Sequence, residues 1–404
     1  DLDGERLRTR PMKGTARRGR TTTEDAAIRA DLATSVKERA ENVMIVDMMR
    51  NDLGRIARSG SVEVSRLWEI ERYPTLFQLT STCEATTDAP VRRILAALFP
   101  SASITGAPKV RTMELIADLE GSPRGIYTGA IGSIGPGRRA RFNVAIRTVH
   151  IDRQAGRAEY GTGGGIVWDS RADDEFAECH AKALVVTSPP PRFDLLETLR
   201  WDPERGFTLL DRHLSRLVDS AEYFDRPLDL DRLGRQLDAA VEGHDTAQRV
   251  RLLVDPTGGV VVETVPLPRG PRRWRLALAA APIDPTERVL FHKTTVRDLY
   301  EVAREAAPGF DDVLLWNPDG ELTESTMANL VVRRDGELLT PPLHCGVLPG
   351  PRRAELLARG RMREAVVRRD DLDACDALFM INSVRGWIPC TVVRSTGGRR
   401  LGTG

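Results

Sequence analysis

The stretch Ser188-Pro189-Pro190-Pro191-Arg192 divides this 404-residue chain near its middle. Prolines lack the amide hydrogen that a helix or an inner strand needs, so three in a row predict a stiff, extended linker over 188–192. The length also exceeds that of one usual hydrophobic core. We therefore place a first domain at 1–187 and a second at 193–404.

Upstream of the linker, helical and strand-like patterns are mixed. Helices are predicted at 24–57, at 108–119 and, after a capping-box start, at 170–184. Strand-like runs occupy 142–146 and 165–168. The first domain is therefore expected to combine α and β elements.

Downstream of the linker, a small unit comes first. The runs 195–199 and 207–210 predict a hairpin, and 213–224 an amphipathic helix. The break Pro268-Arg269-Gly270-Pro271 then divides the second domain into subdomains 193–268 and 269–404. In the larger subdomain we expect strands at 274–279, 312–316 and 330–333, and helices at 294–306 and 352–359.

The composition excludes several classes of protein. The formal net charge is only +1 and the charges are scattered, so neither nucleic acid nor an acidic surface is expected as a partner. No apolar run approaches the length of a bilayer span and no targeting segment is visible, so we expect no membrane association. Five cysteines without CxxC spacing argue against a disulfide framework or a zinc site and fit a reducing cytoplasm. The true start of the protein is expected to precede Asp1.

Lysine is rare in this chain. It occupies positions 13, 37, 109, 182 and 293, whereas 54 of the 59 basic residues are arginine. Lysine, unlike arginine, can lose its proton and act as a nucleophile or form a Schiff base. Each lysine is therefore a candidate functional residue.

Two pairs of carboxylates share one spacing. Glu38 and Glu41 lie three residues apart on one predicted helix, and Glu175 and Glu178 on another. Two converging pairs would form a hard-oxygen site for Mg²⁺. Spacing alone favours two solvated helix faces, and it leaves Lys182 either as an ion-pair partner of Glu178 or as a ligand of an anionic substrate.

Several motifs of the first domain occur together in an order typical of one family. They are PMKGT (11–15), ERAEN (38–42), VDMMRNDLGR (46–55), ITGAPK (104–109), RGIYTGA (124–130) and the glycine-rich run 163–170. This combination resembles the chorismate-binding family of anthranilate and aminodeoxychorismate synthases, over essentially all of residues 3 to 186. The resemblance implies a β-sandwich flanked by helices.

The same resemblance implies a site. Glu41 and Glu178 would hold Mg²⁺, with Glu38 and Glu175 beside them. Lys13 marks the aminodeoxychorismate branch, in which the lysine is taken to add covalently to the chorismate ring before ammonia enters. The residues expected to contact the chorismate carboxylates and ring are Thr15, Tyr127, Arg147, Gly163, Gly165 and Lys182.

The chain departs from this family at three points. The family's acid-base glutamate, in a Ser-Pro-Glu segment, would lie upstream of Asp1, and Gln78 stands where relatives usually have histidine. No glutaminase triad of the Cys-His-Glu kind is found. Ammonia is therefore expected from outside or from a separate glutamine amidotransferase subunit.

The second domain carries one residue for each need of a pyridoxal-phosphate (PLP) enzyme. Such an enzyme needs a lysine for the Schiff base, an acidic group facing the pyridine nitrogen, and a cationic or helix-terminal phosphate site. Lys293, Glu324 and Arg216 are one of each. Taken singly, Arg216 is most often a solvated helix charge and Glu324 a loop carboxylate, but the trio favours a PLP site.

The order of these motifs resembles class IV aminotransferases, which include branched-chain and D-amino-acid transaminases and aminodeoxychorismate lyase, over about residues 193 to 393. Within that group, LETLR (196–200) and FMINSVRGWIP (379–389) look most like the lyase. The chain departs from the usual phosphate turn at Pro351, which supplies no amide donor, although the two arginines that follow could compensate by charge. The resemblance adds to the cofactor site Ser325, Asn329 and Gly350.

Three functions remain open from the sequence. The first is a bifunctional enzyme that aminates chorismate to 4-amino-4-deoxychorismate and then eliminates pyruvate to give 4-aminobenzoate. The second joins an anthranilate-synthase-like half to a branched-chain or D-amino-acid aminotransferase. The third is a non-catalytic chorismate-binding half that supports assembly with an amidotransferase. The fusion favours the first, because its halves resemble successive steps, and a homodimer through the PLP domain is expected from its relatives.

Overall fold

The computed structural model describes residues 1–168, 170–187 and 191–393, and the chain divides into two compact units. The division comes between Pro190 and Pro191, inside the predicted linker, although residues 188–190 lie outside the described residues. One segment does not follow the sequence order, because Gly19–Asp25 packs with the second unit.

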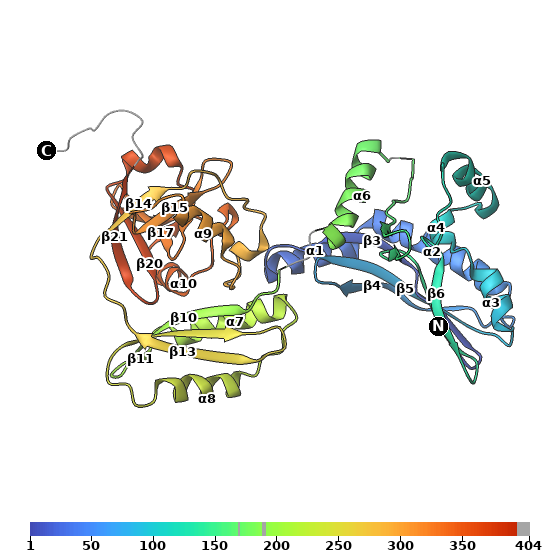
Figure 1. Ribbon diagram of the computed structural model, residues 1–404, viewed down its shortest axis with the longest axis horizontal. Helices are drawn as coiled ribbons and strands as arrows, with labels where there is room; N and C mark the ends of the chain where they lie inside the picture. Colours follow the sequence, from blue (N-terminus) through green and yellow to red (C-terminus); the bar gives the residue numbers. More distant parts are fainter. Residues whose placement is uncertain (169, 188–190, 394–404) are drawn as a thin grey trace. The chain divides into compact units, whose positions relative to one another are not determined.

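The first unit is built on one seven-stranded sheet in which all pairs are antiparallel (Figure 1). The order is β3-β5-β2-β1-β7-β6, and β4 also pairs with β5. Instead of two large facing sheets, the described residues add only a separate hairpin of β8 and β9. The strands are β1 (Leu2–Asp3), β2 (Arg6–Thr9), β3 (Met12–Arg17), β4 (Glu63–Arg72), β5 (Leu76–Thr86), β6 (Ala130–Gly135), β7 (Arg139–Val144), β8 (Val149–Asp152) and β9 (Arg157–Tyr160).

The predicted helix over 24–57 is two helices. They are separated at Ser35, whose extended backbone cannot continue a helix and whose hydroxyl accepts the amide of Glu38 as an N-cap. The second helix buries Val46, Met49 and Leu53 at the spacing of one helix face, within the core of the unit. The helices are α1 (Thr22–Thr34), α2 (Val36–Gly54), α3 (Val91–Leu98), α4 (Ala102–Thr105), α5 (Lys109–Leu119) and α6 (Ala172–Thr187).

Two local predictions for the first unit were wrong. Residues 165–168 form no strand, because Ile166 and Trp168 are 75% and 99% exposed and find no sheet to pack against. The hydroxyl of Ser170 does not form a capping box with Asp173 but donates to Glu175 Oε1 at 2.6 Å. The predicted α6 nevertheless forms.

The second unit begins with a small subdomain. Its four-stranded sheet has the order β11-β10-β12-β13, and its core includes Leu217 of α7 and Leu237 of α8. The predicted hairpin forms, but Leu210 already belongs to α7. The elements are β10 (Leu195–Asp202), β11 (Gly206–Phe207), α7 (Leu210–Tyr223), α8 (Leu230–Val241), β12 (Gln248–Val254) and β13 (Val260–Pro266).

The larger subdomain contains an eight-stranded sheet that closes on itself. Its order is β16-β15-β14-β21-β20-β17-β18-β19, and β16 also pairs with β17, which makes a barrel-like ring of six strands (Figure 1). The strands are β14 (Trp274–Leu278), β15 (Asp312–Trp316), β16 (Leu322–Ser325), β17 (Asn329–Arg334), β18 (Glu337–Thr340), β19 (Arg363–Glu364), β20 (Ala377–Asn382) and β21 (Gly386–Val393).

The helix predicted over 294–306 is shorter than expected. It forms only as α9 (Asp298–Glu305), because Thr294 is paired with Leu195 in an isolated bridge and cannot join a helix. The remaining helix is α10 (Pro351–Ala358), close to the predicted range. Short 3₁₀ turns occupy η1 (Arg288–Leu290), η2 (Leu343–Cys345) and η3 (Arg369–Ala374).

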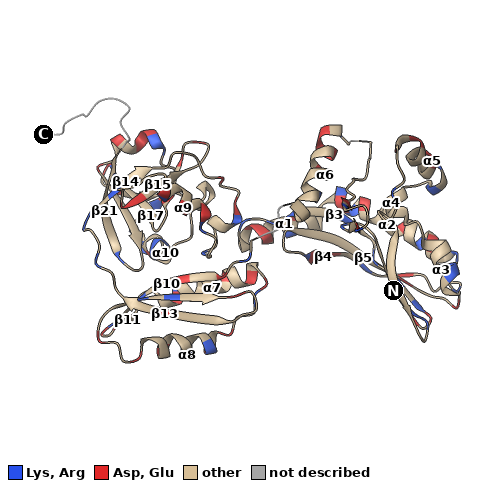
Figure 2. Ribbon diagram, in the orientation of Figure 1, with Lys and Arg blue, Asp and Glu red and all other residues tan. Residues whose placement is uncertain are grey.

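Charges of both signs are spread over both units (Figure 2), as expected from the sequence. Across residues 1–168, 170–187 and 191–393, none of the helices combines the length and the apolar character that a bilayer span requires.

Candidate functional site

A buried carboxylate organises the junction of β10 and α7. Glu197 of β10 is 1% exposed and accepts two hydrogen bonds from Arg216, from Nε to Oε1 at 2.8 Å and from Nη2 to Oε2 at 2.6 Å. His213, one turn before Arg216 on α7, places Nδ1 2.6 Å from Oε2. Burial alone would raise the pKa of Glu197, but Arg216 and His213 outweigh it and lower the pKa to about 2.

This network reaches two further segments. Because a carboxylate only accepts, Nδ1 of His213 carries the hydrogen, and Nε2 accepts from the hydroxyl of Ser383 at 2.8 Å. Arg216 also donates through Nη1 to the carbonyl of Pro349 at 3.2 Å. Glu197 thereby fixes the guanidinium of Arg216 beside the residues that lead into α10.

Lys293 lies between η1 and α9 and is anchored through its backbone. Its carbonyl accepts the amide of Leu196 at 2.9 Å, and the next residue, Thr294, bridges to Leu195. Burial, with the nearby charge of Arg216, lowers the pKa of Lys293 to about 8. A substantial fraction of the amine is therefore neutral, and nucleophilic, near physiological pH.

Glu324 of β16 is 4% exposed and surrounded by donors. It accepts the Tyr300 hydroxyl at 3.1 Å, the Asn329 amide at 3.0 Å and the Leu348 backbone amide at 3.2 Å. Burial outweighs these donors and the charge of Lys293, and raises the pKa of Glu324 to about 7. This carboxyl can share a proton with a basic ring nitrogen near neutral pH.

The start of α10 gives a partial phosphate site. A side chain at Gly350 would place its Cβ 2.0 Å from Oδ1 of Asn329, so glycine is required there. Pro351 contributes no amide, but Nε of Arg352 is buried and has no hydrogen-bond partner among the described residues. The hydroxyl of Ser325 is engaged in its own turn, where it accepts the amide of Ala328 and donates to its carbonyl, both at 3.1 Å.

These residues fit PLP. Lys293 would hold it covalently, Glu324 would face the pyridine nitrogen, and Arg216 with the orphaned Nε of Arg352 would bind the phosphate.

In the first unit, α2 is tied to the strand that carries Lys13. Asn42, fully buried, donates to the carbonyls of Lys13 at 3.1 Å and Leu79 at 3.3 Å and accepts from Ser81 at 2.6 Å. The preceding residue, Glu41, pairs with the ammonium of Lys13 at 3.1 Å. The structure therefore brings two predicted site residues into contact.

The glycine run lies between the two glutamate pairs. A Cβ at Gly165 would lie 3.5 Å from the ammonium of Lys13, and one at Gly164 would lie 2.4 Å from Glu175 Oε2. Lys182 pairs with Glu178 at 2.6 Å and donates to the carbonyl of Gly163 at 2.7 Å. The glycine run therefore lies close to charged groups of both signs.

Three other predicted substrate residues have protein partners. The hydroxyl of Tyr127 lies 2.9 Å from where a Cβ at Gly163 would be, which places it at the same turn. Arg147 donates to the carbonyl of Lys182 at 3.2 Å, so it does not yet point both nitrogens at one ligand. Thr15 donates at 3.1 Å to Gln78, the residue that replaces the expected histidine.

One buried carboxylate oxygen of the glutamate pairs is available to a metal. Oε2 of Glu175 is buried and has no hydrogen-bond partner among the described residues, which fits a hard cation such as Mg²⁺. Within those residues, three ligand atoms lie within 4.8 Å of one another only at Glu321, His344 and Cys345. The ligand atoms of the two glutamate pairs therefore do not form such a close group. In the group of Glu321, His344 and Cys345, the thiol of Cys345 donates to Glu321 at 3.2 Å.

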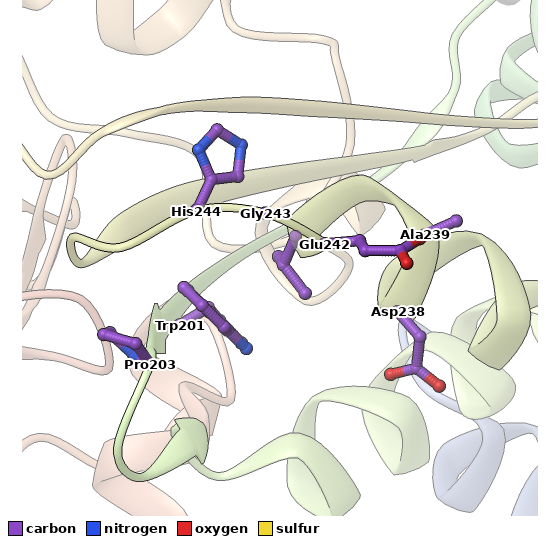
Figure 3. A pocket seen from close by; sticks show the side chains of 8 residues that line it. Trp201, Pro203, Asp238, Ala239, Glu242, Gly243 and His244 are labelled. Carbon is purple, nitrogen blue, oxygen red and sulfur yellow. The ribbon is translucent and has the colours of Figure 1, made fainter.

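Two surface hollows lie outside these sites. One, at the end of α8, is lined by Trp201, Pro203, 238–239 and 241–244 (Figure 3). The other lies along α2 and ends at Lys109, whose ammonium pairs with Asp52 at 3.0 Å. The cation of the ITGAPK motif (104–109) is thus paired within the protein.

Two families match the two units. The family model of chorismate binding enzymes matches residues 1–188, and that of amino-transferase class IV matches residues 194–393. Each half of the chain is therefore similar to the family whose model it matches.

The chorismate-binding half is similar to several curated proteins. Aminodeoxychorismate synthase of Streptomyces griseus is 44% identical over 50% of this chain and 28% of its own length. Aminodeoxychorismate synthase component 1 of Bacillus subtilis is 44% identical over 45% of this chain and 39% of its own length. Anthranilate synthase component 1 3 of Haloarcula marismortui is also 44% identical, over 46% of this chain and 37% of its own length. The chain thus spans about a third of the curated relatives it matches.

The class IV half is similar to solved structures. A putative amino-acid aminotransferase from Mesorhizobium loti is 41% identical, with a TM-score of 0.48 over 50% of this chain and all of that chain. A putative 4-amino-4-deoxychorismate lyase from Legionella pneumophila is 21% identical, with a TM-score of 0.46 over 52% of this chain and 89% of that chain.

Sequence reasoning missed several residues of the class IV site. Glu197 and Ser383 stand within the motifs LETLR and FMINSVRGWIP, and His213 begins the predicted helix 213–224, but the sequence predicts no site role for them or for Tyr300. The three-residue spacing of His213 and Arg216 was a usable signal, because it puts both on one helix face.

Proposed function

We propose that the chain carries two consecutive steps of 4-aminobenzoate synthesis. The chorismate-binding half would aminate chorismate to 4-amino-4-deoxychorismate, and the class IV half would eliminate pyruvate from it. The observation that carries the proposal is the trio of Lys293, Arg216 and Glu324, joined in one chain to a chorismate-binding domain with Lys13 beside Glu41.

In the chorismate-binding half, Glu41 lies beside the proposed nucleophile, Lys13. It lies 3.1 Å from the ammonium of Lys13, which must become neutral before its nitrogen can add to the chorismate ring. Lys182 and Arg147 would bind the substrate carboxylates by exchanging their present carbonyl partners for stronger, charged acceptors. Mg²⁺, held by Glu41 and Glu178 with Glu38 and Glu175 beside them, would neutralise charge on a chorismate carboxylate.

In the class IV half, Lys293 is placed both to attach the cofactor and to move protons. PLP, when bound, supplies an electron sink. The amine of Lys293, whose pKa is lowered to about 8, could accept and return a proton near neutral pH whenever it is not bonded to the cofactor. With PLP bound, Glu324 would help to keep the pyridine nitrogen protonated, and Arg216 would bind the phosphate. Aromatisation of the ring drives the loss of pyruvate.

Ammonia would come from a separate glutamine amidotransferase. The name of the Bacillus subtilis relative, component 1 of the synthase, supports a second component in that protein.

Replacement of Lys293 tests the proposal. Borohydride reduction of the wild-type protein with PLP should leave the cofactor on Lys293, and the protein should release pyruvate from 4-amino-4-deoxychorismate without consuming a keto acid. Lys293→Ala should lose both properties, whereas Lys37→Ala, at an exposed lysine, should keep both. Covalent PLP in Lys293→Ala would refute the assignment, and transamination of branched-chain or D-amino acids without pyruvate release would favour the aminotransferase alternative.

A further inference from the structure

A seven-residue segment from the first half of the sequence is part of the second unit. Gly19–Asp25 follows β3 in the chain but packs with residues 191 onward. The segment is internally tied, because Asp25 accepts the amide of Gly19 at 2.8 Å and Glu24 accepts that of Arg20 at 2.7 Å. It therefore has a defined shape of its own.

Two buried side chains of the second unit donate hydrogen bonds to the backbone of this segment. The hydroxyl of Tyr223, a residue that is 0% exposed, donates to the carbonyl of Gly19 at 2.6 Å. Nε2 of His292, 1% exposed, lies 3.0 Å from the carbonyl of Arg20. Because a carbonyl only accepts, Nε2 carries the hydrogen, and Nδ1 faces the Ser220 hydroxyl at 2.9 Å.

Side-chain contacts add to these bonds. The guanidinium of Arg20 lies over the ring of Phe291, 4.7 Å from its centroid, and donates to the carbonyl of Pro285 at 3.1 Å. Thr22 donates to Asp219 of α7. The rings of Tyr223 and His292 stack with centroids 4.3 Å apart. The segment is thus held at several points along its length.

His292 links this segment to the proposed PLP lysine. His292 directly precedes Lys293, and both of its ring nitrogens have partners, one on α7 and one on the segment. The backbone of Lys293 is fixed on its other side by β10. We propose that Gly19–Thr22 is a strap that positions Lys293 by holding His292, a role that rests on the proposed function of Lys293 as the PLP lysine.

Paired substitutions separate positioning from packing. In His292→Gln the amide nitrogen can take the place of Nε2 and keep the bond to Arg20, whereas in His292→Asn the amide reaches only as far as Nδ1. Tyr223→Phe removes the donor to Gly19 and keeps the ring. Tyr73→Phe is the matched control, because the Tyr73 hydroxyl bonds only Glu71 at an exposed site among the contacts described.

Two measurements on the full chain without cofactor test the strap. Hydrogen exchange of peptides covering 19–25 reports whether the segment is docked. Labelling of Lys293 with an amine reagent over a range of pH, quantified by mass spectrometry, reports how buried its amine is. Tyr223→Phe and His292→Asn should speed exchange about tenfold, the effect of one net hydrogen bond, and should shift labelling of Lys293 to higher pH. His292→Gln and Tyr73→Phe should change neither.

The strap is refuted if exchange speeds up while labelling of Lys293 is unchanged, or if His292→Gln behaves like His292→Asn. Failure of the proposed function has a different signature. Wild-type protein that takes no covalent PLP would refute the PLP role, while both strap measurements, made without cofactor, would still stand or fall by themselves.

Discussion

Replacing the buried carboxylate of Glu197 should strongly destabilise the second unit. Glu197→Gln keeps the size of the side chain but leaves Arg216, whose side chain is 9% exposed, without its anion. The pKa of Glu197 falls from 4.5 to about 2 in the fold, which at 1.36 kcal/mol per unit corresponds to about 3 kcal/mol. Breaking a buried ion pair by removing one partner also costs about 3–5 kcal/mol, so two independent arguments agree.

The pH dependence gives this prediction its sign. A depressed carboxylate pKa contributes stability that is complete above the unfolded value of 4.5 and is lost as pH falls through about 2. The difference between wild type and Glu197→Gln should therefore be full at pH 7 and shrink between pH 4.5 and pH 2. Hydrogen exchange of β10 and α7 peptides measures it locally, which matters because a chain of two units need not unfold in one transition.

A matched control lies on the same sheet. Glu263 pairs with Arg251 at 3.6 Å, and both side chains are about half exposed, so Glu263→Gln should change stability by less than about 0.5 kcal/mol. A difference below about 1 kcal/mol for Glu197→Gln at pH 7, or one that persists unchanged to pH 2, would refute the reasoning.

Three further predictions concern single carboxylates and a lysine. Glu324→Gln should flatten the pH dependence of stability of the cofactor-free protein between pH 4.5 and about 7, where the raised pKa of Glu324 makes wild type lose stability as pH rises; an unchanged slope in denaturant titrations would contradict it. Glu41→Gln and Glu178→Gln should each sharply weaken Mg²⁺-dependent chorismate binding measured by calorimetry, and unchanged metal dependence in both would exclude a joint site. With ammonia, Mg²⁺ and chorismate supplied, Lys13→Ala should abolish 4-aminobenzoate formation or divert product to anthranilate. Mass spectrometry of trapped wild-type protein should show an adduct on Lys13. A wild-type rate in the variant would leave the lysine only an electrostatic role beside Glu41.

The class IV site could be predicted where one residue type meets one chemical need. Lys293, Arg216 and Glu324 each satisfy such a need, and the structure places Arg216 and Glu324 among the charges that act on Lys293. Glu197 could not be predicted in this way. It interrupts the apolar run Leu195-Leu196, and its partner Arg216 lies 19 residues later, so burial of the charge depends on a contact that local pattern does not show.

In the first unit, a helix break could be predicted from local sequence, but the pairing of the strands could not. The break between α1 and α2 had a local signal, because Ser35 stands three residues before Glu38 in the order of a capping box, and the structure shows the corresponding bond to the Glu38 amide. The sheet had none. Pairing of β1 with β7 joins residues 2–3 to 139–140, and such long-range register depends on tertiary contacts rather than on alternation within each strand.

Environment gives the two carboxylates of the class IV site different roles. Burial raises the pKa of both Glu197 and Glu324, but Arg216 and His213 outweigh it at Glu197 and lower that pKa to about 2, whereas at Glu324 burial prevails and raises the pKa to about 7. The first is therefore a permanent anion that holds Arg216 in place, and the second is a group that can carry or share a proton near neutral pH. Glu324 and Lys293, whose pKa is about 8, are therefore the two groups of the site that we expect to exchange protons near neutral pH. A pH profile of pyruvate release should accordingly follow these two groups and be insensitive to Glu197, whose replacement should instead weaken retention of the cofactor's phosphate.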